Sequence, residues 1–168
     1  MFVAGVVTAV VLLFRHGTDW PVPHVDDGQP RSAEIILQEA GNPGIRRPVD
    51  VVRTIDGDTF LARLRQSDGR DLIARVRLRG IDAPEMKASC QDELDKAEAA
   101  TEALRALLGQ GGVTIYNLGP EKYGRVLADV ATRRAANVSA AMLAGGYARS
   151  YNGGHRDGWC ARGWRFWR

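Results

Sequence analysis

The sequence predicts an α+β domain that consists mainly of a five-stranded β-barrel. Three observations support this prediction: β-rich runs recur along the chain, short turns join the first three of them, and two segments have helical spacing. Of the 168 residues, 45% are hydrophobic and 26% are charged. This composition is ordinary for a globular protein with a buried core, and the length indicates one domain. We expect a monomer.

Three strands begin the predicted barrel. The runs VDVVRTI (residues 49–55) and DTFLARLRQ (58–66) are joined at Asp56-Gly57, a dipeptide typical of tight hairpins. A second turn, Ser-Asp-Gly at residues 67–69, leads to LIARVRLRGI (72–81). Short turns between successive strands predict an antiparallel meander.

A helix separates these strands from two more. Leucine, alanine and threonine recur at helical spacing over residues 94–108, and a glycine follows. Further strands are predicted at 112–118 and 125–132, and Asn137 is a suitable N-cap for a second helix over 138–146. A five-stranded closed or nearly closed barrel with a helix between the third and fourth strands has the order of the OB-fold.

The chain divides into four segments around this barrel. Residues 1–14 contain an apolar run that is short for a bilayer span, and we expect a signal or membrane-anchor segment. Residues 15–47 are rich in proline and glycine and are predicted to form a linker. The barrel domain is expected to occupy residues 48–151. A basic tail with several aromatic residues follows at 152–168.

The first segment and the two cysteines bear on the location of the protein. The apolar run predicts a secreted, periplasmic or membrane-anchored protein, with membrane association through this segment as one option. A cytoplasmic location stays open, because no lysine or arginine precedes the run and no A-x-A cleavage motif follows it. Cys90 and Cys160 are predicted to form a disulfide after export, whereas in the cytosol they would stay thiols.

Charged residues gather at one point of the predicted meander. The stretch RVRLRGIDAPEM (75–86) alternates three arginines with smaller or apolar residues, so that period two places all three on one face of a strand. Asp82 and Glu85 follow within one turn. The net charge of the chain is +3, which favours polyanionic partners without excluding other soluble enzymes.

Two carboxylates of the meander are expected to approach each other. Asp58 begins the second predicted strand and Asp82 ends the third, and the first three strands are neighbours in such a barrel. Carboxylates held close together repel unless a proton or a cation lies between them. Ligands that are all oxygen suit a hard cation such as calcium or magnesium. Glu85 stands near enough in sequence to act through a metal-bound water.

Each of these motifs also has a plainer interpretation when taken singly. Asp56 and Asp58 flank a glycine and are typical turn formers. Residues 82–84 form a common type of turn before a helix, and the strand arginines are typical of solvated positions. Arg75 and Arg79 in particular are interpreted as solvated charges or as charges that a substrate meets on its approach.

Several motifs together resemble one known family. IDGDT (55–59), RLRGIDAPE (77–85), EKYGR (121–125) and NVSAAMLAGGYA (137–148) occur in this order. They resemble the staphylococcal nuclease (thermonuclease) family, and the resemblance extends over roughly residues 49–151. Each motif alone is weak, whereas the ordered set is specific.

The resemblance implies a calcium site. Asp58 and Asp82 match the calcium-binding aspartates of that family. Ala83 replaces the threonine that is usual there, but the family uses the backbone carbonyl of this residue, which alanine also provides.

The resemblance also implies a catalytic set. Arg77 and Arg125 match the two arginines that bind the scissile phosphate, and Glu85 matches the glutamate that positions or deprotonates the attacking water. A planar guanidinium fits two phosphate oxygens at once. The residues implied to contact the nucleotide are Lys122, Tyr123 and Tyr151. Tyr151 lies near the position of a pocket tyrosine of the family but is not strictly aligned with it.

The sequence thus predicts a calcium-dependent nuclease that hydrolyses phosphodiester bonds of DNA, RNA or both. One alternative is an OB-fold module that binds nucleic acid without cleaving it. Another is a membrane-tethered interaction domain whose acids hold structural calcium. A degenerate member of the family would be expected to lose an acid or an arginine of the site. This chain keeps three acids and two arginines, namely Asp58, Asp82, Glu85, Arg77 and Arg125, which favours the enzyme.

Overall fold

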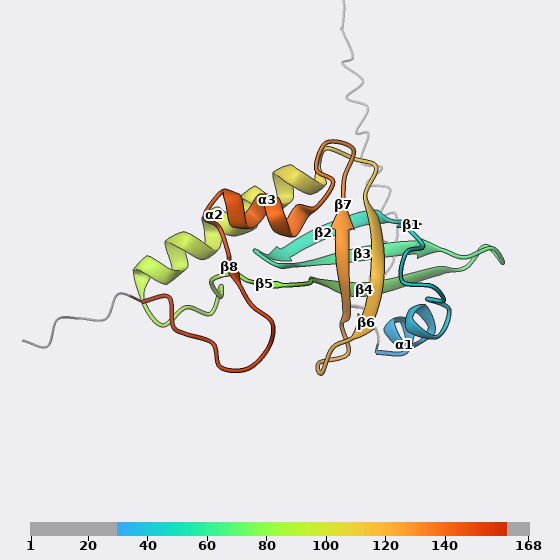
Figure 1. Ribbon diagram of the computed structural model, residues 1–168, viewed down its shortest axis with the longest axis horizontal. Coiled ribbons are helices and arrows are strands. Elements are labelled where there is room, and N and C mark those ends of the chain that lie inside the picture. The colour runs from blue at the N-terminus through green and yellow to red at the C-terminus, as the bar shows by residue number, and fades with distance from the viewer. Residues whose placement is uncertain (1–29, 161–168) are drawn as a thin grey trace, which may run out of the picture.

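The computed structural model describes residues 30–160, which form a twisted mixed sheet with helices at its two ends (Figure 1). Segments 1–29 and 161–168 lie outside the described residues, and with them the predicted signal or anchor segment and the end of the predicted tail. Within the described range, no helix has the length and apolar character needed to cross a bilayer.

The main sheet has six strands in the order β1-β6-β7-β4-β3-β2. The antiparallel meander predicted from the short turns is present as β2, β3 and β4, and a hairpin of β6 and β7 joins it because β7 pairs parallel with β4. The strands are β1 (Arg47–Pro48), β2 (Asp50–Asp56), β3 (Thr59–Arg65), β4 (Asp71–Leu78), β6 (Thr114–Pro120) and β7 (Val126–Ala131).

The edges of this sheet correct the predicted barrel. Among the described residues, β1 and β2 lie at opposite edges and share no ladder, so the sheet is open and mixed rather than a closed five-stranded barrel. β1 is only two residues long and includes Pro48, which has no N–H to donate. Val49 alone separates β1 from β2, and its amide donates to Val113 O at 3.0 Å. The backbone itself therefore connects the two edges.

Two helices cover one end of the sheet (Figure 1). α2 (Gln91–Leu108) buries residues at helical spacing, Ala100 and Leu104 among them, and ends at a glycine as predicted. α3 (Val138–Ala144) begins at Asn137, whose side chain accepts a hydrogen bond from Ala140 N at 2.8 Å. This contact is the N-cap that the sequence predicted.

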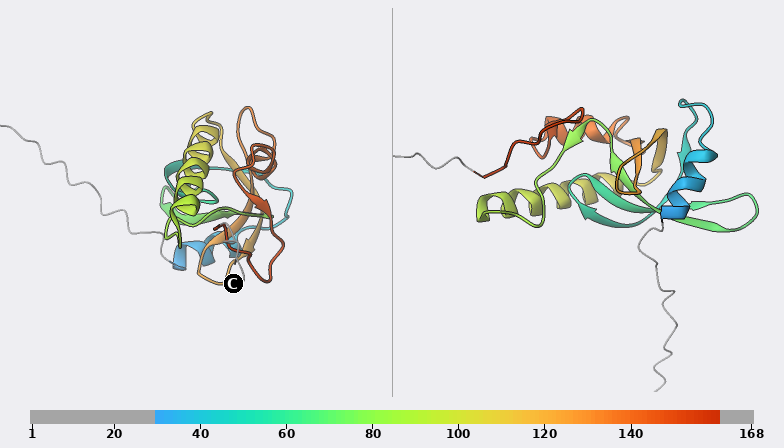
Figure 2. Two further views of the ribbon diagram at one scale, coloured as in Figure 1. Left: turned by 90° about the vertical axis from the view of Figure 1, so that its left-hand side faces the viewer. Right: turned by 90° about the horizontal axis from the view of Figure 1, so that it is seen from below.

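A third helix was not predicted. α1 (Pro30–Gln38) lies within residues 15–47, which the sequence analysis assigned to a linker, and that assignment does not hold here. Ala33 and Ile36 are 3% and 1% exposed and belong to the central core. In Figure 2, α1 lies at the opposite end of the sheet from α2. The two buried residues are three positions apart and share one face of the helix, a pattern too short to stand out among the prolines.

The core continues from the sheet to a small second sheet. Phe60, Ile115 and Met142 are fully buried in one cluster that joins the meander, the hairpin and α3. The second sheet pairs β5 (Ile81–Asp82) with β8 (Arg149–Ser150) in antiparallel fashion. The acidic turn that follows β4 is thereby fixed against the last part of the chain.

If α1 is an integral part of the fold, Ile36→Ala should lower the free energy of unfolding by about 2–5 kcal/mol, as buried isoleucines do when a cavity is left. Ile35→Ala is the matched control, because the Ile35 side chain is 37% exposed. Urea denaturation followed by circular dichroism measures both variants. Equal, small losses for the two would show that α1 does not contribute to the core.

Candidate active site

The pairing of β3 with β4 places the first acid beside an arginine. Thr59 pairs with Arg77 in the antiparallel register, so Asp58 lies directly at the end of β4. Leu78 N donates to Asp58 O at 2.8 Å, which continues the ladder by one step. Two residues that are far apart in sequence thus meet because of strand register alone.

Arg77 contacts both aspartates of the predicted calcium site. Its guanidinium forms an ion pair with Asp58, lies 3.8 Å from Asp82 Oδ1, and donates to Ile81 O at 3.1 Å. Arg77, Asp58 and Asp82 are 4%, 7% and 5% exposed. The two acids are therefore brought together, as the sequence predicted, and Arg77 is a buried partner of both rather than a solvated residue.

The two turns that carry the acids are packed tightly against each other and against α2. Ala83 N donates to Asp58 Oδ2 at 3.0 Å, which joins the two halves of the predicted calcium site. A Cβ atom added at Gly57 would lie 2.6 Å from Ala100 Cβ and 2.8 Å from Ala83 Cβ. Gly57 is therefore needed for close approach of the helix, in addition to its role in the turn.

The β6–β7 loop carries the second predicted arginine. Arg125 makes two hydrogen bonds of 3.0 Å to the carboxylate of Glu121, and Gly124 adopts a φ of +71° that allows the tight turn. Burial of Glu121 opposes its ionisation, but hydrogen bonds from Arg125 and from Tyr123 N hold the pKa of Glu121 below its usual value. Tyr123 is 67% exposed, and the Lys122 ammonium lies 4.6 Å from its ring centroid.

A cavity of about 1050 Å³ joins these two regions. Asp82 and Ala83 do not line it and are buried beside Asp58. The other predicted catalytic, metal-binding and nucleotide-binding residues all line it: Asp58, Arg77, Glu85, Lys122, Tyr123, Arg125 and Tyr151.

Asp56 is a cavity residue to which the sequence analysis gave only a turn-forming role. Its carboxylate accepts a hydrogen bond from Asp58 N at 3.0 Å and faces the cavity. Burial, followed by the charge of Asp58, raises the pKa of Asp56 to about 6. The Asp-Gly-Asp spacing was the sequence feature that could have indicated a site role for Asp56. Spacing alone, however, does not distinguish a turn-forming aspartate from one that faces a site.

Arg79 corrects the prediction of a solvated charge, whereas a role in substrate approach stays a prediction because Arg79 lines the cavity. It is half-buried, and its guanidinium donates to Asn117 O at 2.6 Å and to Leu127 O at 3.4 Å. These bonds tie β6 and β7 to the end of β4. Arg75 is also half-buried and lines the cavity, where a role in substrate approach remains a prediction.

The segment after β8 folds back over the cavity, although residues 152–168 were predicted to be a separate tail. Tyr151 donates from its hydroxyl to Gly154 O at 2.9 Å and from its amide to Gly80 O at 2.9 Å. Arg156 reaches Glu85 Oε1 at 2.9 Å and Asp82 Oδ1 at 3.2 Å. Arg156 is a site residue that the sequence analysis missed, because it lies beyond the motifs of the resemblance.

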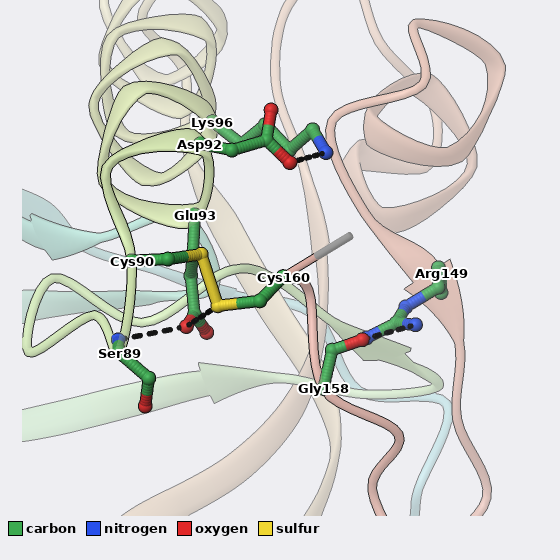
Figure 3. Close-up of a disulfide and its surroundings, with 8 residues drawn as sticks. All are labelled: Ser89, Cys90, Asp92, Glu93, Lys96, Arg149, Gly158 and Cys160. Carbon is green, nitrogen blue, oxygen red and sulfur yellow. Dashed lines mark hydrogen bonds and ion pairs between the residues drawn. A yellow bond between two sulfur atoms is a disulfide. The ribbon is translucent and has the colours of Figure 1, made fainter. Parts of the chain in front are cut away.

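A disulfide between Cys90 and Cys160 closes this segment onto the start of α2 (Figure 3). The Cα atoms of the two cysteines are 6.0 Å apart, within the range of protein disulfides. Beside the bond, the buried Glu93 accepts a hydrogen bond from Ser89 N at 3.0 Å. The bond therefore ties the helix behind the acidic turn to the segment that crosses the cavity.

The site combines buried acids with several guanidinium groups. Asp58 and Asp82 offer only oxygen atoms, and both are oriented by cationic or N–H donors, so the donor set suits a hard cation. Arg77, Arg125 and Lys122 add positive charge around the same cavity. The arrangement suits a site that binds an anionic substrate and holds a cation on its acids.

Comparison with known proteins agrees with this description. The family model for staphylococcal nuclease homologues matches residues 75–158, which includes the first part of the segment predicted to be a tail, Arg156 among it. Two curated relatives, each named "Uncharacterized endonuclease" and from Escherichia coli and Escherichia coli O157:H7, are 34% identical over 101 residues. The match covers 60% of this chain and 59% of each relative.

The disulfide predicts that native protein purified without reductant contains no titratable thiol. Closing a loop with a sequence separation of 70 would restrict the unfolded chain by roughly 4 kcal/mol in the chain-entropy model. Titration with a thiol reagent in denaturant, before and after reduction, provides the measurement. Two thiols in the unreduced sample would contradict the bond.

Proposed function

The chain belongs to the staphylococcal nuclease homologue family, and from this premise we propose that it is a nuclease that hydrolyses phosphodiester bonds of DNA, RNA or both. One observation carries the proposal: buried Arg77, paired with two acids, lines the same cavity as Arg125, which directly precedes the neighbouring strand β7. The endonuclease names are those of the two relatives, and this chain spans 59% of the length of each. The names support nuclease activity as a proposal for this chain.

The proposed reaction needs positive charge around a phosphate. Attack on a phosphodiester adds negative charge to a centre that is already anionic, and groups aimed at its oxygens stabilise the transition state. We assign this role to Arg77 and Arg125, whose guanidinium groups line the same cavity from two different strand ends. Both are oriented by carboxylates, Arg77 by Asp58 and Arg125 by Glu121, so neither must be ordered when substrate binds.

Glu85 is assigned to the attacking water. Its side chain is 57% exposed and lines the cavity, which leaves it accessible to solvent. It lies three residues after Asp82, on the turn fixed by β5. A carboxylate so placed can accept a proton from water that approaches the phosphate.

We propose calcium as the cofactor. Asp58, Asp82 and the carbonyl of Ala83 would hold it, and the bound ion would supply Lewis-acid stabilisation of charge on the phosphate. The hydrogen bond from Ala83 N to Asp58 supports this assignment, because it joins the β2–β3 turn, which carries Asp58, to the segment after β4, which carries Asp82 and Ala83.

The nucleotide is expected to lie against the β6–β7 loop and the start of the last segment. Lys122 and exposed Tyr123 provide a charge and a ring, and Tyr151 provides a second ring in the same cavity. Aromatic faces stack on bases of any sequence, and lysine pairs with phosphate. These features support a substrate with accessible bases, such as single-stranded nucleic acid.

We further propose that the protein works in an oxidising compartment, secreted, periplasmic or anchored in a membrane. The Cys90–Cys160 bond supports this location, because structural disulfides persist in such environments and are rare in the cytosol.

Calcium dependence predicts that purified protein degrades single-stranded or denatured DNA when calcium is present and stops when the ion is chelated. Release of acid-soluble nucleotides measures cleavage, and re-addition of calcium in excess of chelator serves as the control. RNA is tested in parallel. Undiminished cleavage in excess chelator would contradict a role for calcium in the reaction. Binding of nucleic acid without any cleavage would favour the OB-fold binding module.

Glu85→Gln and Arg125→Ala should each lower the turnover number by on the order of a hundredfold or more, because each removes a group directed at the reaction centre. Arg77 is less suitable, since its loss would leave the buried carboxylate of Asp58 without its ion-pair partner. Matched controls are Glu98→Gln and Arg105→Ala on the exposed face of α2. Circular dichroism verifies folding. Near-normal turnover in either site variant would refute that assignment.

A further inference from the structure

Three arginines surround Asp82, the more enclosed acid of the proposed calcium site. Arg77 lies 3.8 Å from Asp82 Oδ1, Arg156 lies 3.2 Å from the same oxygen, and Arg149 lies 3.9 Å from Oδ2. Since Asp82 is 5% exposed, these charges act on it with little screening by water. A divalent ion that binds Asp82 must compete with them.

The three arginines differ in their freedom to move. Arg77 is buried and held by Asp58 and Ile81 O. Arg149 donates to Asp157 O at 2.7 Å and lies 3.6 Å from the ring centroid of Trp159. The Arg156 side chain is 37% exposed, close to the 39% of Arg149, and it contacts the carboxylates of Asp82 and Glu85 and the ring of Tyr151. Of the three arginines, Arg156 therefore lies closest to Asp82, and it is far more exposed than Arg77.

The segment that carries Arg156 is fixed at both ends. On one side, Tyr151 is bonded to Gly80 and Gly154, and glycines 153 and 154 adopt positive φ angles of 97° and 96° that turn the chain back toward the cavity. On the other side, Cys160 is bonded to Cys90 (Figure 3). A short tether of this kind keeps a charged group at a high effective concentration near its site.

We propose that Arg156 is a tethered internal cation of the active site, which occupies Asp82 and Glu85 and competes with the divalent ion for Asp82. Arg156 would thus set the calcium concentration at which the site loads, and the disulfide would keep it in place to do so. This inference rests on the proposed function, because it assumes that Asp82 is a calcium ligand.

The test is the calcium dissociation constant of the full chain, measured by isothermal titration calorimetry without substrate. Arg156→Gln should bind calcium more tightly, by on the order of fivefold, the scale expected for the loss of partly exposed ion pairs. Arg156→Lys keeps the charge and should stay near the wild-type value. Lys122→Gln removes one positive charge from the same cavity without an acid contact at Asp82, and it should change affinity less than Arg156→Gln.

The tether is tested by repeating the comparison in a Cys90→Ser/Cys160→Ser background, with folding verified by circular dichroism. Releasing the segment should shrink the effect of Arg156→Gln, and an effect of undiminished size would overturn the tether. Equal calcium affinity of wild type and Arg156→Gln, while the wild type binds calcium and cleaves nucleic acid, would overturn the competition alone. Absence of calcium binding in every variant would overturn the calcium site of the proposed function as well.

Discussion

The buried ion pair of Arg77 with Asp58, extended to Asp82, is the interaction on which the site depends. All three side chains are almost fully buried, and without Arg77 the charge of Asp58 would lose its ion-pair partner. An isolated charge in a protein interior costs several kcal/mol even after relaxation. The fold must therefore bring the end of β4, the start of β3 and the turn after β4 together, and it does so through strand register.

This constraint produces a site with a rigid floor and an accessible rim. The floor consists of buried acids and Arg77, which are held by backbone and ionic contacts. The rim consists of exposed groups such as Glu85, Tyr123 and Arg156, which come from three different loops. Such a division suits a reaction in which charge must be preorganised while a polymeric substrate enters and leaves.

The helix α2 braces the floor from behind. It approaches the β2–β3 turn closely at Gly57, where no side chain fits, and its N-cap residue Cys90 forms the disulfide with Cys160. One helix thus fixes both the acids and the segment that crosses the cavity. A change that displaces α2 would therefore move both the acids and the segment that crosses the cavity.

Sequence by itself determined the order of the principal elements and most of the site. Hairpin signals, helical spacing and the N-cap at Asn137 are local properties, and each predicts its element without knowledge of the rest of the chain. The approach of Asp58 to the end of β4 was also expected from sequence, because short turns make the first three strands neighbours, whereas the register itself is seen only in the structure. The family resemblance supplied the roles of these residues.

Only the tertiary structure decided the remaining features. The edges of the sheet are joined through Val49 rather than through a ladder, α1 packs on the core instead of forming a linker, and Arg79 bonds to β6 and β7. Arg156 meets Glu85 across a separation of 71 residues. Contacts of this kind leave no periodic trace in the sequence, because they depend on how distant segments close onto one another after the local elements have formed.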